Sequence, residues 1–319
     1  AAVDGTFKVL YCQGEDILQS DPNTHHVAAG LKAMECVIVH DLFLNETANY
    51  AHIFLPGSTF LEKTGTFTNA ERRIQMVRRV MEPANGLEDW QVTQALANAM
   101  GLGWTYDDPS QIMDEIARLT PSFAGVSHAR LDAEGSLQWP VNDAAPHGTP
   151  VMHVDGFVRG RGKFIVTDYI PTDEKTGPRF PLLLTTGRIL SHYNVGAQTR
   201  RTDNVAWHPE DLLEMHGTDA ENRGLKNGDW ARLASRTGET TLRVCVTDRV
   251  APGVVYTTFH HPATQANVVT TEYSDWATNC PEYKVTAVQV AGSNGPSEWQ
   301  ADYASQSQHS RRITADGAR

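Results

Sequence analysis

The chain has 319 residues, which is enough for two domains with packed cores. Its charged fraction of 20% and hydrophobic fraction of 40% are typical of a globular protein. The formal net charge of −11 argues against a nucleic-acid partner, and no apolar run approaches the length of a membrane span.

The cysteines argue against several kinds of site. Cys12, Cys36, Cys245 and Cys280 are scattered, and no two have the CxxC spacing of an iron–sulfur or zinc framework. Free thiols of this kind favour a cytoplasmic protein. The chain opens AAVDGTFKVL, without an initiator methionine or a visible signal peptide, and we therefore expect a fragment of a longer protein.

Short apolar runs alternate with helical patterns in the first part of the chain. The patterns predict strands at 7–12, 36–41 and 51–57, and helices at 23–34, 88–103 and 107–121. Such alternation is typical of a parallel α/β sheet. We therefore expect a Rossmann-like α/β domain over residues 1–120.

The pattern then weakens and becomes β. Frequent proline and glycine predict an extended linker over 121–181. Beyond it, strands are predicted at 182–186, 230–235, 241–246, 253–258 and 285–290, with one helical turn at 218–225. Many short strands with one helix predict a closed β-barrel over 182–295, followed by a polar, extended tail at 296–319.

Acidic residues lie at the ends of two predicted strands. Gly14, Glu15 and Asp16 follow the first strand, and His40 and Asp41 end the second. Ligands of parallel sheets lie beyond the carboxyl ends of the strands, and carboxylates accept hydrogen bonds from guanine or ribose. The alternative is that these carboxylates cap helices. There is no GxGxxG motif, which argues against a nicotinamide dinucleotide site here.

A second polar cluster follows Gly187. It combines cations, amides and hydroxyls, namely Arg188, Ser191, His192, Tyr193, Asn194, Gln198, Arg200 and Arg201. This set suits a ligand with phosphates and ring heteroatoms, and the alternative is an ordinary solvated loop. The adjacent His260 and His261 do not predict a metal site, because neighbouring histidines rarely share one ion and no third ligand is suitably spaced.

Several motifs resemble one family. The segments LLTTGRILSHYNVGAQTRR, GLKNGDWARLASRTGE and NCPEYKVTAVQV resemble the C-terminal domain of molybdopterin-guanine-dinucleotide (MGD) oxidoreductases. The segments YCQGEDILQSDPN, VIVHDLFLNETANYAHIFLPGSTFLEKTGTFTNAERRIQ and EDWQ resemble the preceding domain. FHHPATQANVVTTEYSDWATNCPEYK is particularly similar to the catalytic alpha subunit of NAD-dependent formate dehydrogenases. The resemblance covers nearly the whole chain, but only the C-terminal third or so of the family's subunit.

The resemblance implies a double-psi β-barrel of six strands and a set of cofactor-binding residues. It places one MGD nucleotide at Gly14, Glu15, Asp16, Ser20, His40, Asp41 and Asp89. It places the pterin and phosphates at Thr186, Gly187, Arg188, Ile189, His192, Tyr193, Asn267, Tyr283 and Lys284. Asp89 is the residue expected to grip guanine, and its alternative role is a helix cap. One of the adjacent Arg72 and Arg73 is expected to point inward.

The resemblance also implies that the catalytic centre is not carried by this segment. Family members hold molybdenum or tungsten through two MGDs and a cysteine or selenocysteine that precedes a histidine. None of the four cysteines here precedes a histidine, and the family's catalytic arginine lies upstream. We therefore expect no metal ligand and no catalytic residue in this segment, and no activity from the segment alone. The 4Fe–4S clusters are expected only in the missing upstream sequence.

The function implied is reversible oxidation of formate to CO2 at a molybdenum bis-MGD centre, with electrons passed to NAD+. The implied partners are the rest of the alpha subunit, an NAD-reducing subunit with FMN and iron–sulfur clusters, and a small iron–sulfur subunit. One alternative is another enzyme of the superfamily, such as a nitrate or arsenate reductase. The other is a cofactor-free structural relative in a complex-I-like assembly. Retention of Arg188, His192, Asn267 and Lys284 argues against that loss of cofactor.

Overall fold

The computed structural model describes residues 1–157 and 159–305. The chain divides into two compact units. The first comprises residues 1–39 and 43–54 together with the chain from residue 170 onward, and the second comprises residues 40–42 and 55–169. Within the described ranges, no helix is both long and apolar enough to cross a membrane.

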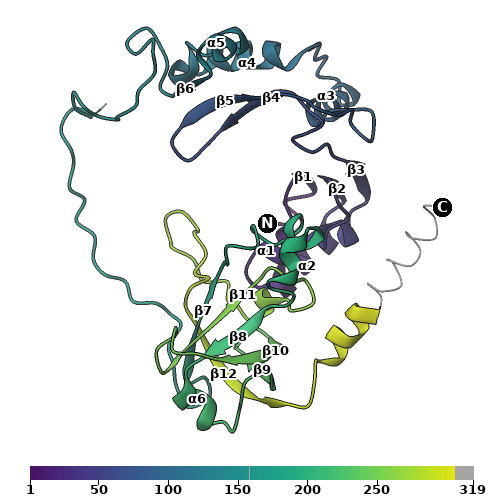
Figure 1. The fold of residues 1–319 in the computed structure, drawn as a ribbon, viewed down its shortest axis with the longest axis vertical. Helices are drawn as coiled ribbons and strands as arrows, with labels where there is room; N and C mark the ends of the chain where they lie inside the picture. Colours follow the sequence, from purple (N-terminus) through teal and green to yellow (C-terminus); the bar gives the residue numbers. More distant parts are fainter. Residues whose placement is uncertain (158, 306–319) are drawn as a thin grey trace. The chain divides into compact units, whose positions relative to one another are not determined.

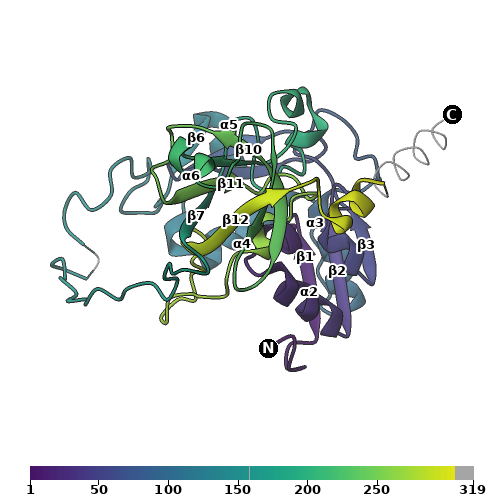
Figure 2. The same ribbon diagram turned by 90° about the horizontal axis from the view of Figure 1, so that it is seen from below.

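The N-terminal strands form a parallel sheet in the order β1-β2-β3, as predicted (Figure 2). Its elements are β1 (Val9–Gln13), α1 (Ile17–Ser20), α2 (Thr24–Ala33), β2 (Cys36–Asp41), η1 (Thr47–Tyr50) and β3 (Ile53–Pro56). The side chain of Asn23 caps α2 by accepting a hydrogen bond from the His26 amide at 3.2 Å. Leu31, Val37 and Val39 are fully buried in the core between the helices and the sheet.

The second unit contains an antiparallel sheet that the sequence did not predict. Its strands are β4 (Gly65–Thr68), β5 (Arg73–Val77) and β6 (Ser136–Gln138), in the order β4-β5-β6. Its helices are α3 (Asp89–Ala99), α4 (Pro109–Leu119), η2 (Pro121–Phe123) and α5 (His128–Glu134). The two helices predicted at 88–103 and 107–121 are confirmed as α3 and α4.

The predicted linker over 121–181 is wrong in its first part. Residues 121–138 form η2, α5 and β6, and Leu131 and Leu137 are buried against Ile74 of β5. These elements are too short for a helical or alternating pattern to stand out, so the sequence analysis missed them. From 161 to 169 the chain has no helix or strand, and Phe164 is fully exposed.

Six strands form a closed barrel, which confirms the predicted barrel fold (Figure 1). They are β7 (Leu182–Gly187), β8 (Leu212–Met215), β9 (Trp230–Ala234), β10 (Glu239–Val246), β11 (Val254–Thr258) and β12 (Thr286–Ser293), in the order β10-β8-β11-β7-β12-β9. β7 pairs in parallel with β11 and antiparallel with β12. The single helix, α6 (Gly217–Glu221), lies in the connection from β8 to β9.

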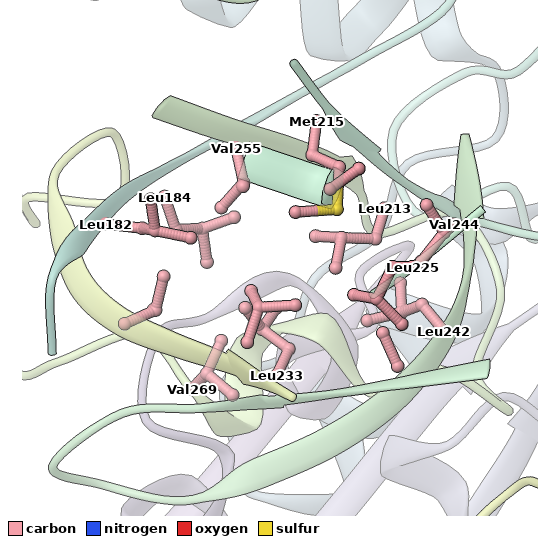
Figure 3. Packing of buried hydrophobic residues seen from close by; sticks show 14 of the residues in the cluster. Leu182, Leu184, Leu213, Met215, Leu225, Leu233, Leu242, Val244, Val255 and Val269 are labelled. Atoms are coloured by element: carbon pink, nitrogen blue, oxygen red, sulfur yellow. The ribbon is translucent and has the colours of Figure 1, made fainter. Parts of the chain in front are cut away.

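Aliphatic side chains fill the barrel interior (Figure 3). Leu184, Leu213, Met215, Leu233 and Val255 are completely buried there. On β7 the buried residues Leu182, Leu184 and Thr186 alternate with more exposed neighbours, as one inward face of a strand requires. This core fixes the end of β7, from which the polar loop at Arg188 departs.

The predicted extended tail is also corrected in part. Residues 298–305 are helical, and Gln300 is buried with its side-chain amide donating to the Thr241 carbonyl at 2.8 Å. A polar sequence concealed this docking, because Gln300 binds the barrel through hydrogen bonds and not through apolar contact. The rest of the predicted tail, 306–319, lies outside the described residues.

Candidate cofactor-binding site

The end of β7 is joined to the segment that carries Tyr283 and Lys284. The Thr186 hydroxyl donates to the Tyr283 carbonyl at 3.1 Å, and the Lys284 ammonium donates to the Thr186 carbonyl. These bonds bring together residues almost a hundred positions apart in the sequence. Gly187 closes the strand, and a side chain there would collide with Tyr256, since an added Cβ would lie 2.6 Å from its ring.

Arg188 and Lys284 form a pair of exposed cations beside this join. The guanidinium of Arg188 donates to the Asn194 side-chain oxygen at 3.2 Å and lies over the Phe259 ring, with 5.3 Å between the guanidinium carbon and the ring centre. Burial lowers the pKa of Lys284, and the positive charge of Arg188 lowers it further. The two cations are therefore close enough to repel each other, and both predicted residues lie at the same end of the barrel.

Some polar side chains in the loop after Arg188 are bonded within the protein, while others are available to a ligand. Both ring nitrogens of His192 are engaged, Nδ1 with the Thr199 hydroxyl at 2.9 Å and Nε2 with the His208 carbonyl at 3.0 Å. His192 is buried and supports the loop, contrary to the expectation that it faces a ligand. Tyr193 is 80% exposed, and within the described residues the buried hydroxyl of Ser191 has no hydrogen-bond partner.

Asn267 joins the barrel to the N-terminal sheet. Its side-chain amide donates to the Gln19 carbonyl at 2.9 Å and to the Ser20 carbonyl at 3.1 Å, and the side chain is buried. Both amide hydrogens are therefore used. In this structure Asn267 holds two parts of the protein together, and its side-chain N–H groups are used for that join.

The acidic residues after β1 also have different roles from one another. The carboxylate of Asp16 is buried and accepts hydrogen bonds from the Thr47 amide at 3.0 Å, the Thr47 hydroxyl at 2.7 Å and the Glu46 amide at 3.3 Å. Asp16 therefore binds the first residues of η1 from a distant position in the chain, and its side chain does not cap α1, the helix that follows it, so the helix-cap alternative is wrong for this residue. Gly14 is exposed and Glu15 is partly exposed, so both remain accessible.

The acidic segment after β1 and the cation Arg188 both affect the pKa of Tyr283. Burial raises the pKa of the Tyr283 hydroxyl, and the carboxylates of Asp21 and Glu15 raise it further, while Arg188 opposes them. Tyr283 therefore lies within reach of charges from both segments. This end of the first unit offers cations, a phenol and carboxylates together, which are the groups that bind phosphates, sugar hydroxyls and heteroaromatic rings.

A separate group of polar residues surrounds Asp89 in the second unit. One carboxylate oxygen accepts from the Ser58 amide at 2.7 Å and lies 3.3 Å from His40 Nε2, and the other binds the Lys63 ammonium. Burial alone would raise the pKa of Asp89, but the bonds from His40, Lys63 and Ser58 hold this pKa well below its ordinary value. The sequence analysis missed Lys63 and Ser58, which carry no motif of their own.

Asp89 does not cap α3, so the alternative role considered for it is wrong. Glu88 is the N-cap and forms a capping box with Gln91. Asp41, which ends β2, accepts a hydrogen bond from the Leu42 amide at 2.6 Å. Asp89 is thus a fully ionised carboxylate beside a histidine and a lysine, and Asp41 is a second carboxylate within the same unit.

Of the two adjacent arginines, Arg72 points inward. It has a left-handed backbone conformation with φ of 65°, and its guanidinium donates to the carbonyls of Trp139, Thr149 and Pro150. These carbonyls belong to the protein's own chain, so Arg72 fixes a local turn. Arg73 is paired with Glu71 at 3.3 Å.

Within the described ranges, no three histidine, cysteine or acidic side chains are grouped so that they could hold a metal ion. The rings of His260 and His261 each lie 5.3 Å from the ring of His192. His261 Nε2 contacts the His208 carbonyl at 3.0 Å. Because a carbonyl can only accept, this nitrogen carries a hydrogen and is not available as a metal ligand.

Two family models match the chain. Residues 1–99 match the molybdopterin oxidoreductase model, and residues 182–287 match the molydopterin dinucleotide binding domain. The chain belongs to the molybdopterin oxidoreductase family. The second match begins at the first residue of β7 and ends inside β12, so it spans the barrel described above.

Other molybdopterin oxidoreductases give the same result. The alpha subunit of F420-dependent formate dehydrogenase 1 of Methanococcus maripaludis is 38% identical over 289 residues, which are 89% of this chain and 43% of that protein. A putative formate dehydrogenase of Staphylococcus aureus is 38% identical over 302 residues, 90% of this chain and 30% of that protein. The chain therefore spans less than half the length of these relatives.

A solved structure shows the same fold. Acetylene hydratase from Pelobacter acetylenicus superposes with a TM-score of 0.69 over 91% of this chain and 45% of its own, at 15% sequence identity. This likeness shows that the two proteins share a fold. It says nothing about substrate, because the identity is too low.

Proposed function

We propose that this chain is the cofactor-binding C-terminal part of a formate dehydrogenase alpha subunit that uses molybdenum or tungsten bis-MGD. The proposal rests on 38% identity to formate dehydrogenase subunits along nearly the whole chain, together with the exposed cations at the end of β7. Nitrate and arsenate reductases, which the sequence left open, have no such support among these relatives. A cofactor-free role is disfavoured by an exposed arginine–lysine pair, which repels itself without an anion between its members.

The donor set of the first unit fits a pyrophosphate and a pterin. Arg188 offers a planar fork, Lys284 a point charge, and Tyr193 and Tyr283 offer hydroxyls. The buried Ser191 hydroxyl, which lacks a partner within the described residues, is a further group that a ligand would satisfy. Thr186, Gly187 and Ile189 supply the backbone that positions them. The bound cofactor would supply the redox chemistry.

Two separate groups of acidic residues, one in each unit, are proposed as acceptors for guanine or ribose. In the first unit the acceptor is Glu15, with Gly14 exposed and Ser20 half-buried nearby in the sequence. In the second unit they are Asp41 and Asp89, with His40 and Lys63 holding Asp89 in its ionised form. Ionised carboxylates are the acceptors that the paired N–H groups of guanine require.

The two family matches support separate roles for the two parts of the chain. We propose that residues 1–120 bind one MGD and that the barrel at 182–295 binds the pterin and phosphates. The metal ligand, the 4Fe–4S clusters and the catalytic residues belong to sequence before this segment. The remaining partners are an NAD-reducing flavin and iron–sulfur subunit and a small iron–sulfur subunit in the cytoplasm.

The electron acceptor has two candidates. The motif resemblance favours NAD+, reached through the flavin subunit. The relatives from Methanococcus maripaludis and Methanocaldococcus jannaschii are named as F420-dependent, which favours a deazaflavin acceptor instead. Reduction of each acceptor by the purified complex with formate decides between them.

The test of the proposal uses the complete subunit. It should contain about two MGDs and one metal atom per polypeptide and reduce an artificial dye with formate as the electron donor, whereas nitrate or arsenate should not reoxidise the reduced dye. The isolated 319-residue chain should show no turnover above a metal-free control. Absence of pterin from the complete subunit would contradict cofactor binding, and pterin without formate turnover would contradict the substrate alone.

A further inference from the structure

His260 is a completely buried side chain that the proposed site does not use. Its Nε2 lies 3.2 Å from the amide nitrogen of Ile189, and its Nδ1 lies 2.5 Å from the carbonyl oxygen of Asn194. An amide N–H can only donate and a carbonyl can only accept. Nε2 must therefore be the acceptor and Nδ1 must carry the hydrogen, which fixes the ring as one neutral tautomer.

The two groups that this ring contacts lie at the two ends of the loop that carries the Arg188 site. Ile189 directly follows Arg188, and the side chain of Asn194 accepts from the Arg188 guanidinium at 3.2 Å. The ring therefore holds both the backbone next to Arg188 and the residue that binds its side chain. A single imidazole spans the loop, and its Nε2 holds the backbone directly beside Arg188, so loss of this acceptor is the change that releases Arg188.

His260 is itself held firmly. The carboxylate of Asp211 accepts from the His260 amide at 3.1 Å and from the His261 amide at 2.9 Å. The Arg200 guanidinium donates to the His260 carbonyl. With its backbone fixed from both sides, the ring acts on the loop as a rigid support and does not follow it.

We infer that His260 is a positioning residue whose neutral imidazole sets the conformation of residues 188–194 and so aims Arg188. The inference rests on the proposed function only in taking Arg188 as a cofactor contact. A proton on Nε2 would turn the acceptor into a donor that faces the Ile189 N–H. The loop should then detach from its support, so the aim of Arg188 becomes sensitive to acid.

The charges around the ring favour the neutral form. Burial lowers the pKa of His260, and the nearby His192 and Arg188 lower it further, whereas the Asn194 carbonyl and the Asp211 carboxylate raise it. The rings of His192 and Phe259 lie beside the His260 ring, and the Arg200 guanidinium donates to the His260 carbonyl. The net direction is downward, so the support is intact at neutral pH and weakens as the pH falls below the ordinary histidine pKa of about 6.5.

Two substitutions separate the two contacts of the ring. In His260→Gln the side-chain oxygen can replace Nε2 as the acceptor for Ile189, while in His260→Asn the side-chain amide can replace only the Nδ1–H donor. The readout is tryptic cleavage after Arg188 in the complete subunit, measured relative to cleavage after the exposed Lys226. This ratio cancels the pH dependence of the protease. It also requires no bound cofactor.

We expect His260→Asn to raise the cleavage ratio roughly 3- to 10-fold at pH 7.5, the effect of losing one hydrogen bond, and His260→Gln to leave it near the wild-type value. The wild-type ratio should rise as the pH is lowered to 5.5, and in His260→Gln it should not. His261→Gln is the matched control, because the His261 ring contacts His208 and not the loop. It should behave as the wild type at both pH values.

Equal cleavage of the Asn and Gln variants, or a wild-type pH response retained in His260→Gln, would overturn the inference. The pH comparison of wild type with His260→Gln decides the matter even if His260→Asn fails to fold. Pterin content is measured in parallel. If cleavage responds as expected while pterin retention is unchanged in every variant, the support by His260 stands and the cofactor role of Arg188 is wrong.

Discussion

The side-chain amides of Gln19 and Asn267 connect the N-terminal sheet to the barrel in both directions. Gln19 donates to carbonyls of the barrel region, and Asn267 donates to carbonyls of the N-terminal region. Asn267 donates to the carbonyls of Gln19 and Ser20, while Gln19 donates to the carbonyls of Phe259 at 2.9 Å and Val195 at 3.0 Å. Both side chains are buried. Four hydrogen bonds from two amides therefore define how the acidic segment after β1 meets the loop after β7.

The contribution of these hydrogen bonds to the free energy of unfolding should be measurable. Asn267→Ala and Gln19→Ala should each lower the free energy of unfolding by about 1–3 kcal/mol, because each removes two hydrogen bonds to backbone carbonyls at a buried join. The double variant should lose less than the sum, since both act on one join. Urea unfolding provides the measurement, and Gln198→Ala, at an exposed position, is the control. Losses below about 0.5 kcal/mol would show that water replaces these bonds.

Asp89→Asn should destabilise the protein by about 1.5–3 kcal/mol, because it removes a charged acceptor for Lys63, Ser58 and His40. The matched control is Asp108→Asn, which changes a true helix cap and should have little effect, since both residues cap well.

The pH dependence gives a second test of the same carboxylate. Because the folded-state pKa of Asp89 is lowered, its stabilisation is complete above the ordinary carboxylate pKa and is lost as the pH falls. The wild type should therefore lose more stability than Asp89→Asn between about pH 5 and pH 2. Acid unfolding curves with the same slope for both proteins would contradict this.

The features of the fold that could be predicted depend on local pattern. The apolar runs of β2, β7 and β11 and the helical spacing in α3 and α4 predict their own structure, because burial on one face requires those periods. β8 is a strand of only four residues, located between His208 and His216 and without a turn signal of its own. The sequence pattern did not predict it. Its strand conformation comes from pairing with β10 and β11, which the local sequence does not encode.

The residues of the candidate site could likewise be predicted only in part from the sequence. Arg188 and Lys284 were identified by resemblance, and exposure leaves them available. Asp16, His192 and Asn267 belong to the same motifs, yet their polar atoms are used inside the protein. Lys63 and Gln19 carry no motif, and only tertiary contacts reveal what they hold. The type of a polar residue determines which hydrogen bonds it can form. Whether those bonds go to the protein or to a ligand depends on the tertiary contacts of the side chain.

Arg188→Met should raise the pKa of Lys284, because it removes the nearby positive charge that lowers it. Arg188→Lys should leave this pKa low, since the charge is kept. The pH dependence of Lys284 acylation, followed by mass spectrometry, measures both. Arg188→Lys should nevertheless reduce pterin retention in the complete subunit, because a lysine lacks the planar fork. An unchanged Lys284 profile in Arg188→Met would mean that the two cations do not interact.

The helix at 298–305 should detach when its contact with the sheet is removed. The Tyr303 hydroxyl donates to the Glu46 carboxylate at 2.7 Å. Tyr303→Phe should lower the free energy of unfolding at pH 7 by about 1.5 kcal/mol and increase amide hydrogen exchange across 298–305. Tyr169→Phe, at an exposed position, is the control. Unaltered exchange would show that Gln300 alone anchors the helix.

The substitution Tyr303→Phe should also change the pKa of Glu46. Burial raises the pKa of Glu46, and the bond from Tyr303 lowers it, so Tyr303→Phe should raise it further. A carboxylate with a raised pKa loses stability as the pH rises above its ordinary value. The variant should therefore lose stability more steeply than the wild type between about pH 4.5 and pH 7.

The pairing of β7 has a consequence for the order of events during synthesis. Both neighbours of β7 in the barrel, β11 and β12, are translated long after it, so Leu182–Gly187 emerges from the ribosome with no partner strand. Thr186 also receives its bond from Lys284 only after residue 284 has been translated. Contacts so distant in sequence form late. The end of β7 is therefore held in place late, and a ligand that needs both Arg188 and Lys284 cannot bind before Lys284 has been translated.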